Sequence, residues 1–218
     1  MKEHWEEEKI VELFANKEPD YRMLELIQNY PKKSSFLDLG CAAGRNTVYL
    51  AQQGFDFYAI DFSEAMLNKT KEQLKLILPE TELAKRVLKM KMDDLDFEDN
   101  YFDFIIALGI IQDAQSEEEW HRVVAECARV LKPNGKILVA HFSPDSNPHG
   151  TGVQLVEGTK HLYTGFAPNR KLNLLSAKEL DENMLEHGFH SISKTSSVKI
   201  KTNKGYRTTV NGYYQLFK

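Results

Sequence analysis

The sequence lacks the features that mark several large classes of protein. Of its 218 residues only two are cysteines, Cys41 and Cys127, and neither has a spaced partner that indicates a disulfide framework or a zinc site. No stretch approaches the roughly 20 apolar residues of a membrane span, and no apolar run follows a basic start at the N-terminus. These absences predict a cytoplasmic protein with no metal site, neither secreted nor embedded in a membrane.

A broad excess of basic residues is also missing. The formal net charge is -4, and a nucleic-acid surface needs clustered Lys and Arg to neutralise phosphates. Residues 189–218 contain no Asp or Glu and six Lys or Arg, which we interpret as a solvated strand face rather than a contact for an anionic partner. The composition therefore argues against nucleic acid as a partner, and it does not indicate the oligomeric state.

Apolar runs alternate with helical patterns along most of the chain, which predicts a parallel sheet covered on both faces. The expected strands lie at residues 35–39, 55–60, 87–92, 101–108 and 136–142. Two later segments, 191–200 and 206–217, are separated by so few residues that they must pair antiparallel. The prediction is an α/β fold: a Rossmann-like, doubly wound, seven-stranded sheet, mostly parallel with an antiparallel last strand.

Helix starts are marked by capping residues. Ser116 and Glu119 form a capping-box pattern ahead of apolar residues at helical spacing, and Ser176 and Glu179 form a second one. Ser63 is placed to cap the helix that follows the second strand. These patterns predict helices from about residues 63, 116 and 176.

The length and composition predict one domain over residues 1–218. We expect a helical N-terminal cap at 1–30, a cofactor-binding core at 35–142, a substrate-side insert at 143–175, and a closing helix and strand pair at 176–218. A loop as long as the insert is usually functional in a compact domain. The cap and the insert are therefore expected to close over the acceptor.

The chemistry is concentrated where the first two strands end. A turn of small residues, Gly40-x-Ala42-x-Gly44, follows the first strand, and Asp61 ends the second. A dinucleotide site has its glycines at G-x-G-x-x-G, facing a pyrophosphate. Here the last glycine comes one position early, and Asp38 precedes the first. That carboxylate repels a pyrophosphate but attracts an α-ammonium and a sulfonium, the two cations of S-adenosylmethionine.

The segment Asp38-Leu-Gly-Cys-Ala-Ala-Gly-Arg-Asn46 resembles the first motif of the class I S-adenosylmethionine-dependent methyltransferases. It is most similar to the small-molecule type (methyltransferase type 11/25-like), except that Ala42 replaces a glycine. The resemblance continues through residues 61–67, 94–103 and 128–138. It implies methyl transfer to a small-molecule acceptor by in-line displacement, with S-adenosylhomocysteine as the product.

The resemblance also implies a set of cofactor-binding residues. Asp38 and the Gly40 backbone are expected at the methionine end, and Asp61 at both ribose hydroxyls. The acid that usually reads adenine falls on Lys91, so Asp93 or Asp94, or the backbone of Met92 and Asp93, is expected to replace it, with Asp93 favoured. The full predicted set is Asp38, Gly40, Cys41, Ala42, Gly44, Asn46, Asp61, Phe62, Met66, Met92, Asp93, Leu108 and Gly109.

The acceptor side is less defined, and the sequence assigns no catalytic base. Candidates for a base are His141, His149, His161, Tyr21 and Tyr163, and the residues predicted to bind substrate are Trp5, Tyr21, His141 and Tyr163. No Asn/Asp-Pro-Pro-aromatic segment follows the fourth strand, and no Pro-Cys or Thr-Cys nucleophile is present. Both absences argue against a nucleobase acceptor and favour a small molecule.

Two other functions stay open at this stage. A nicotinamide-dependent oxidoreductase can use a related sheet, although Asp38, the early glycine and the closing antiparallel pair count against it. A non-catalytic module that binds an adenosyl cofactor is compatible with a chain that has no assigned base.

Overall fold

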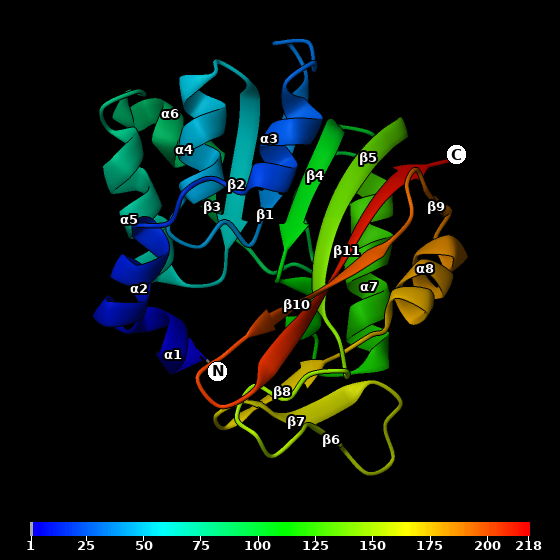
Figure 1. Cartoon of the computed structure of the whole chain (residues 1–218). Helices are drawn as coiled ribbons and strands as arrows, with labels where there is room; N and C mark the ends of the chain where they lie inside the picture. The colour runs from blue at the N-terminus through cyan, green and yellow to red at the C-terminus, as the bar shows by residue number, and fades with distance from the viewer. Residues whose placement is uncertain (1) are drawn as a thin grey trace.

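The computed structural model describes residues 2–218, with side chains from residue 4 onward. Its main sheet has the strand order β10-β11-β5-β4-β1-β2-β3 (Figure 1). The strands are β1 (Ser35–Leu39), β2 (Asp56–Asp61), β3 (Val87–Lys89), β4 (Phe102–Leu108), β5 (Leu131–Phe142), β9 (Phe189–Ser191), β10 (Ser196–Lys201) and β11 (Tyr206–Leu216).

The sheet confirms the predicted doubly wound topology. The neighbouring strands β3, β2, β1, β4 and β5 pair in parallel, and β11 pairs antiparallel with β5. The path contains seven strands, and β9 pairs with β11 as an eighth. Strand order reverses between β1 and β4, and ligands bind beyond the carboxyl ends of the strands at such a switch point.

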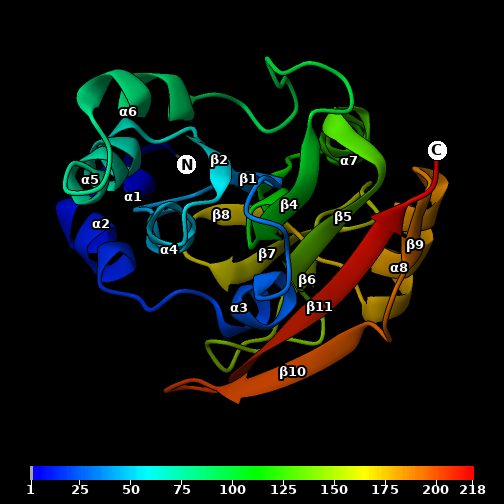
Figure 2. The ribbon, with the colours of Figure 1, turned by 90° about the horizontal axis from the view of Figure 1, so that it is seen from above.

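Helices cover both faces of this sheet (Figure 2). They are α1 (Lys2–Glu6), α2 (Glu8–Ala15), α3 (Tyr21–Ile27), α4 (Arg45–Gln52), α5 (Glu64–Leu74), α6 (Glu80–Arg86), the 3₁₀ turn η1 (Ile111–Asp113), α7 (Glu117–Val130) and α8 (Ala177–Glu186). Leu37 and Leu39 of β1 face the core formed with α7 and α8, whereas Phe36 faces the core formed with α3 and α4. This alternation is what a strand buried on both faces requires.

Several element boundaries differ from those predicted. The turn expected at 132–135 lies inside β5 as an irregularity, where Asn134 has φ +64° and the register to β4 shifts. The segment predicted as one strand at 191–200 is divided into β9 and β10, which pair with different parts of β11. The strand expected at 87–92 ends at Lys89.

One of the two capping boxes is complete. Ser176 accepts from the Glu179 N–H and the Glu179 carboxylate accepts from the Ser176 N–H. At α7, Ser116 accepts from the Glu119 N–H, but the Glu119 carboxylate accepts from Gln115 N (2.7 Å) instead. That shift turns Glu119 toward the loop that precedes the helix.

The segment predicted as an irregular insert forms a small antiparallel sheet of β6 (Gln154–Leu155), β7 (Leu162–Ala167) and β8 (Arg170–Asn173). This sheet and the N-terminal helices α1 and α2 lie at the end of the molecule toward which β2 and β4 point (Figure 1). They therefore flank the carboxyl ends of the strands.

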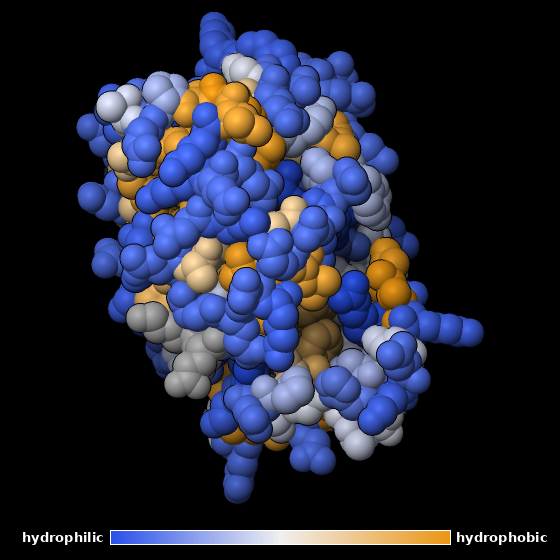
Figure 3. Space-filling view, turned by 90° about the vertical axis from the view of Figure 1, so that its left-hand side faces the viewer, coloured by the Kyte–Doolittle hydropathy of each residue, from blue (hydrophilic) through white to orange (hydrophobic). Residues whose placement is uncertain are grey.

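The surface on the side of α1 and α2 is mostly polar, with apolar residues confined to patches and to a recess (Figure 3).

Within residues 2–218, none of the helices combines the length and the apolar composition that a membrane crossing needs.

Candidate active site

The turn between β1 and α4 bends through three residues in the left-handed region. Gly40 has φ +72°, Ala42 has φ +48° and Gly44 has φ +88°. A Cβ on Gly40 would lie 2.6 Å from the Ile110 side chain, and one on Gly44 would lie 2.8 Å from the Thr70 side chain. Ala42 is therefore the residue of this turn that holds a left-handed conformation with a side chain, which costs roughly 1–2 kcal/mol.

Asp61 connects this turn to the next helix. Its carboxylate accepts from Ala42 N (2.9 Å) with one oxygen and from Ser63 N (2.8 Å) with the other. Ser63 caps α5 itself by accepting from Met66 N (3.2 Å). Burial raises the pKa of Asp61, and the two backbone N–H groups oppose that rise. Each carboxylate oxygen keeps a further lone pair, so a ligand diol can still donate to it.

Asp38 lies behind the turn and is almost completely buried, with 2% of its surface exposed. Thr47 of α4 donates to its carboxylate at 2.6 Å. Burial raises the pKa of Asp38 to about 6, and the Thr47 hydroxyl and the Arg45 cation oppose that rise. The group therefore changes charge close to neutral pH.

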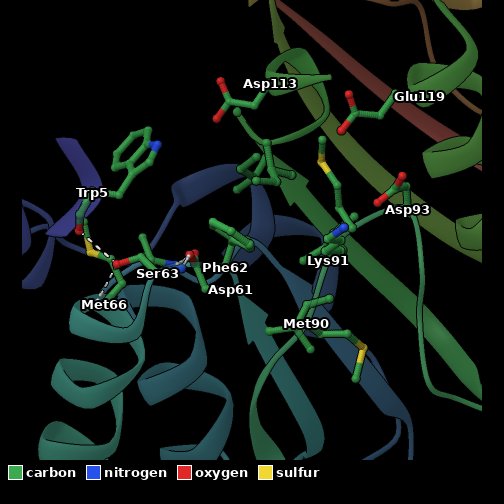
Figure 4. A pocket seen from close by; sticks show the side chains of 18 of the residues that line it. Trp5, Asp61, Phe62, Ser63, Met66, Met90, Lys91, Asp93, Asp113 and Glu119 are labelled. Carbon is green, nitrogen blue, oxygen red and sulfur yellow. Dashed lines mark hydrogen bonds between the residues drawn. The ribbon is translucent and has the colours of Figure 1, made fainter. Parts of the chain in front are cut away.

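A cavity of about 530 Å³ opens where β1, β2 and β4 end (Figure 4). One part of its wall is formed by the β1 turn and the end of β2, and another by residues 90–93. A third part follows β4 and reaches the start of α7. The lining residues are Trp5, Phe14, Leu39, Gly40, Ala42, Ile60, Asp61, Phe62, Ser63, Met66, Met90, Lys91, Met92, Asp93, Leu108, Gly109, Ile110, Asp113, Gln115, Glu119 and Arg122.

Helix α1 covers one side of this cavity and is attached to α5. The Glu6 carboxylate accepts from the N–H groups of Glu64 and Ala65, both at 3.1 Å, at the N-terminus of α5. Ser63 Oγ donates to Trp5 O at 2.9 Å. The Trp5 ring meets the Phe14 ring edge to face, with centroids 5.5 Å apart. The N-terminal helices thus form part of the wall, whereas no residue of 143–175 lines it, and closure of the two segments over an acceptor stays a prediction.

Most of the predicted cofactor-binding residues come together here. The cavity is lined by Gly40, Ala42, Asp61, Phe62, Met66, Met92, Asp93, Leu108 and Gly109. A small adjoining hollow, which shares Gly40 and Leu108 with the cavity, is lined by Asp38, Cys41 and Asn46. Asn46 also accepts from Asp20 N (2.9 Å), which ties the start of α3 to α4. Gly44 lines neither space and instead packs against Thr70.

The residues proposed to read adenine lie in one tight turn. Lys91 and Asp94 form an isolated bridge, and Lys91, Met92 and Asp93 all line the cavity. The Asp93 carboxylate already accepts from Arg122 of α7 at 3.1 Å. Its reading of a base therefore stays a prediction, and the backbone of this turn is the other candidate.

The predicted acceptor-side residues are dispersed. Trp5 lines the cavity, but Tyr21, His141 and Tyr163 do not. Tyr21 is 62% exposed on α3, and Tyr163 packs in the small apolar cluster of the insert. His141 is fully buried, donates through Nδ1 to Phe142 O (3.0 Å), and has its pKa lowered to about 4 by burial.

The other two histidine candidates hold the insert in place. His161 Nδ1 lies 2.9 Å from the Glu117 carboxylate of α7, and His149 Nε2 donates to Phe166 O at 3.2 Å. Neither residue lines the cavity. Their positions favour a structural role for both.

The sequence did not predict the polar side chains on the part of the cavity wall that follows β4. Asp113, Gln115, Glu119 and Arg122 all line the cavity. Residues 108–113 lack the Asn/Asp-Pro-Pro-aromatic motif, and residues 116–119 carry a capping-box pattern. Nothing local in either segment signals that the two converge on one cavity.

Comparison with known proteins agrees with this geometry. Residues 37–139 match the family described as "Methyltransferase domain". A phosphatidylethanolamine N-methyltransferase from Cereibacter sphaeroides is 33% identical over 90 residues, which cover 41% of this chain and 42% of that protein. The chain thus spans less than half the length of this curated relative.

Two solved structures share the fold over most of the chain. A SAM-dependent methyltransferase from Methanosarcina mazei superposes with a TM-score of 0.68 at 18% identity, covering 91% of this chain and 99% of that one. The 1,6-didemethyltoxoflavin-N1-methyltransferase of Burkholderia thailandensis, with its substrate and S-adenosylhomocysteine bound, has a TM-score of 0.65 at 18% identity, covering 98% and 81%. The match over residues 37–139 shows that the chain contains a methyltransferase domain, and the two superpositions show that it has the fold of S-adenosylmethionine-dependent methyltransferases.

Proposed function

We propose that this protein transfers the methyl group of S-adenosylmethionine to a small-molecule acceptor. The observation that carries the proposal is one cavity of about 530 Å³ with Asp61 on the wall formed by β2, polar groups beyond β4, and the aromatic rings of Trp5 and Phe14 from the N-terminal helices. The first region suits an adenosyl ligand, and the second leaves room for an acceptor beside it.

The residues present fit the cofactor. Gly40 lines the cavity, and a side chain at this position would collide with Ile110. Asp61 offers two carboxylate oxygens to a ribose diol, and Asp38 offers a buried carboxylate to an α-ammonium. The bound cofactor supplies an electrophilic methyl group on a sulfonium. Leu108 and Gly109, at the end of β4, are our candidates for lining the path of transfer.

The protein's share of the chemistry is alignment and exclusion of water, which can account for much of the lowering of the barrier. Trp5 and Phe14 close one side of the cavity with apolar surface, while Gln115, Glu119 and Arg122 add polar groups on another. That mixture supports a partly apolar acceptor carrying one or a few polar groups. The acceptors named for the two relatives, phosphatidylethanolamine and 1,6-didemethyltoxoflavin, also favour a small molecule over a macromolecule.

The test is transfer of labelled methyl from S-adenosylmethionine to a panel of three acceptors: a phenol (1-naphthol), a primary amine (tryptamine) and a thiol (2-mercaptoethanol). We expect label in at least one product and formation of S-adenosylhomocysteine in equal amount. Failure of the protein to bind either S-adenosylmethionine or S-adenosylhomocysteine would overturn the proposal.

A further inference from the structure

Asp113 is a carboxylate on the cavity wall to which the cofactor site assigns no role. It ends η1, shortly after β4, and its side chain is 11% exposed. One carboxylate oxygen is paired with the Arg170 guanidinium. The other has no hydrogen-bond partner among the residues whose side chains are described. Asp113 therefore keeps one oxygen for a ligand.

Arg170 of the insert holds this carboxylate by an ion pair. It begins β8 of the insert, 57 residues beyond Asp113, and its own side chain is 12% exposed. Its guanidinium also lies 4.9 Å from the centre of the Trp5 ring (Trp5 and Asp113 are labelled in Figure 4). Because guanidinium stays charged and planar, it fixes the orientation of Asp113 and joins the insert to α1.

The other carboxylates on the cavity wall are held by different partners. Asp61 accepts from two backbone N–H groups beside the ribose position. Asp93 is paired with Arg122 at 3.1 Å, and Glu119 accepts from Gln115 N at 2.7 Å. None of the histidine and tyrosine candidates for a base lines the cavity. Asp93 and Glu119 bind these partners through one oxygen each, as Asp113 does. Asp113 differs from Asp93 in the lower exposure of its side chain, 11% against 17%, and its Arg170 partner is itself only 12% exposed.

We propose that Asp113 is the general base of this enzyme and that Arg170 is its positioning residue. The inference rests on the proposed function. When an acceptor N–H or O–H is methylated, a bond forms between its N or O and the methyl carbon, and the S–CH₃ bond breaks with its electron pair returning to sulfur. One proton leaves the acceptor, and the unpaired oxygen of Asp113 takes it.

The charges around Asp113 suit this role. Burial raises the pKa of Asp113 to about 6, the Arg170 cation opposes the rise, and the Asp61 and Glu119 carboxylates add to it. The carboxylate is therefore largely ionised at pH 7.5 and can accept a proton.

The first test compares Asp113→Asn with wild type in the three-acceptor assay at pH 7.5. The expected result is a loss of turnover of about 100-fold with 1-naphthol or tryptamine, since a positioned base contributes on this scale. The affinity for S-adenosylhomocysteine stays within about threefold, because Asp113 does not hold the cofactor. Asp145→Asn is the matched control, since Asp145 is an exposed aspartate paired with Lys199, and it should behave as wild type.

Turnover of Asp113→Asn within about threefold of wild type would overturn the inference while leaving the proposed function intact. Loss of cofactor binding by wild type would instead remove the proposed function. These two failures are distinguishable because the first is seen in turnover and the second in binding.

A second measurement needs no acceptor. The Asp113 carboxyl is followed by ¹³C NMR, assigned from its absence in Asp113→Asn, in complexes with S-adenosylmethionine and with S-adenosylhomocysteine. The two ligands differ by the sulfonium charge, so a carboxylate facing the transfer path should titrate at least about half a pKa unit lower in the first complex. Equal pKa values in both complexes would contradict the assignment.

Arg170 supplies a third test. Arg170→Met removes the cation that lowers the pKa of Asp113, so the acidic limb of the pH–rate profile should move to higher pH. Arg170→Lys keeps the charge and should return the limb toward its wild-type position. A profile that stays in place in Arg170→Met would show that Arg170 serves only the fold.

Discussion

At the scale of single residues, the turn after β1 shows a conflict between backbone and side chain. Ala42 occupies a left-handed conformation that suits glycine, and its N–H is needed by Asp61. Ala42→Val should weaken binding of S-adenosylhomocysteine at least tenfold, because a β-branched side chain strains this φ and enters the cavity. Ala42→Gly is the matched control and should bind within about threefold of wild type. Calorimetry compares the two, and equal affinities would show that the turn tolerates side chains.

The affinity for S-adenosylhomocysteine is predicted to depend on pH through Asp38. Its pKa is raised to about 6 by burial, so the free carboxyl is neutral below that pH and charged above it. An α-ammonium is attracted by the charged form, so affinity for S-adenosylhomocysteine should rise about tenfold from pH 5 to pH 7, as the ionised fraction does. This ligand has no sulfonium, which separates the effect from that of Asp113. In Asp38→Asn the dependence should disappear, and its persistence would assign the titration to another group.

The effect of the Asp38 carboxyl on the stability of the folded protein has the opposite dependence on pH. A carboxyl whose folded pKa is raised contributes stability below its unfolded pKa, and that contribution is lost as pH rises through about 6. Binding of a cationic ligand compensates for this loss at neutral pH. The buried acid thus lowers the stability of the free protein and strengthens the complex.

At the scale of elements, α1 is a short helix held to α5 by few polar contacts. Glu6 accepts from two N–H groups at the α5 N-terminus, where a negative charge also favours the helix dipole. Glu6→Gln should increase hydrogen exchange in residues 2–15 and speed dissociation of S-adenosylhomocysteine about threefold to tenfold, with little change in global unfolding. Glu8→Gln, an exposed change on α2, is the control. Unchanged exchange and dissociation in Glu6→Gln would show that α1 is held by its apolar contacts.

Elements with strong local signals were predicted well. The almost continuous apolar run of β4 and the apolar spacing of α7 need no distant partner to be recognised. The boundary between β9 and β10 could not be predicted, because it depends on which part of β11 each segment reaches. The strands of the insert are short and find their partners only within the insert. Their pairing depends on tertiary context more than on local pattern.

At the scale of the whole molecule, more of the residues predicted to bind the cofactor than of those predicted to bind the acceptor line the cavity. Asp38, Gly40 and Asp61 lie in short motifs that directly follow or end strands, so their convergence follows from the sheet topology. The pairing of Asp113 with Arg170 spans 57 residues and arises only when the insert folds back over η1. Side chains brought together by a loop leave no periodic pattern in the sequence.

The central claim is that the β1 turn and Asp61 form an adenosyl-cofactor site. Titration calorimetry of wild type and Asp61→Ala with S-adenosylmethionine, S-adenosylhomocysteine and NAD tests it most directly. The account predicts that both adenosyl compounds bind wild type, that NAD does not, and that Asp61→Ala binds at least about tenfold more weakly with its fold intact, since the two hydrogen bonds to a carboxylate contribute about 1.5–3 kcal/mol each. Binding of NAD without the adenosyl compounds, or unchanged affinity in Asp61→Ala, would contradict it.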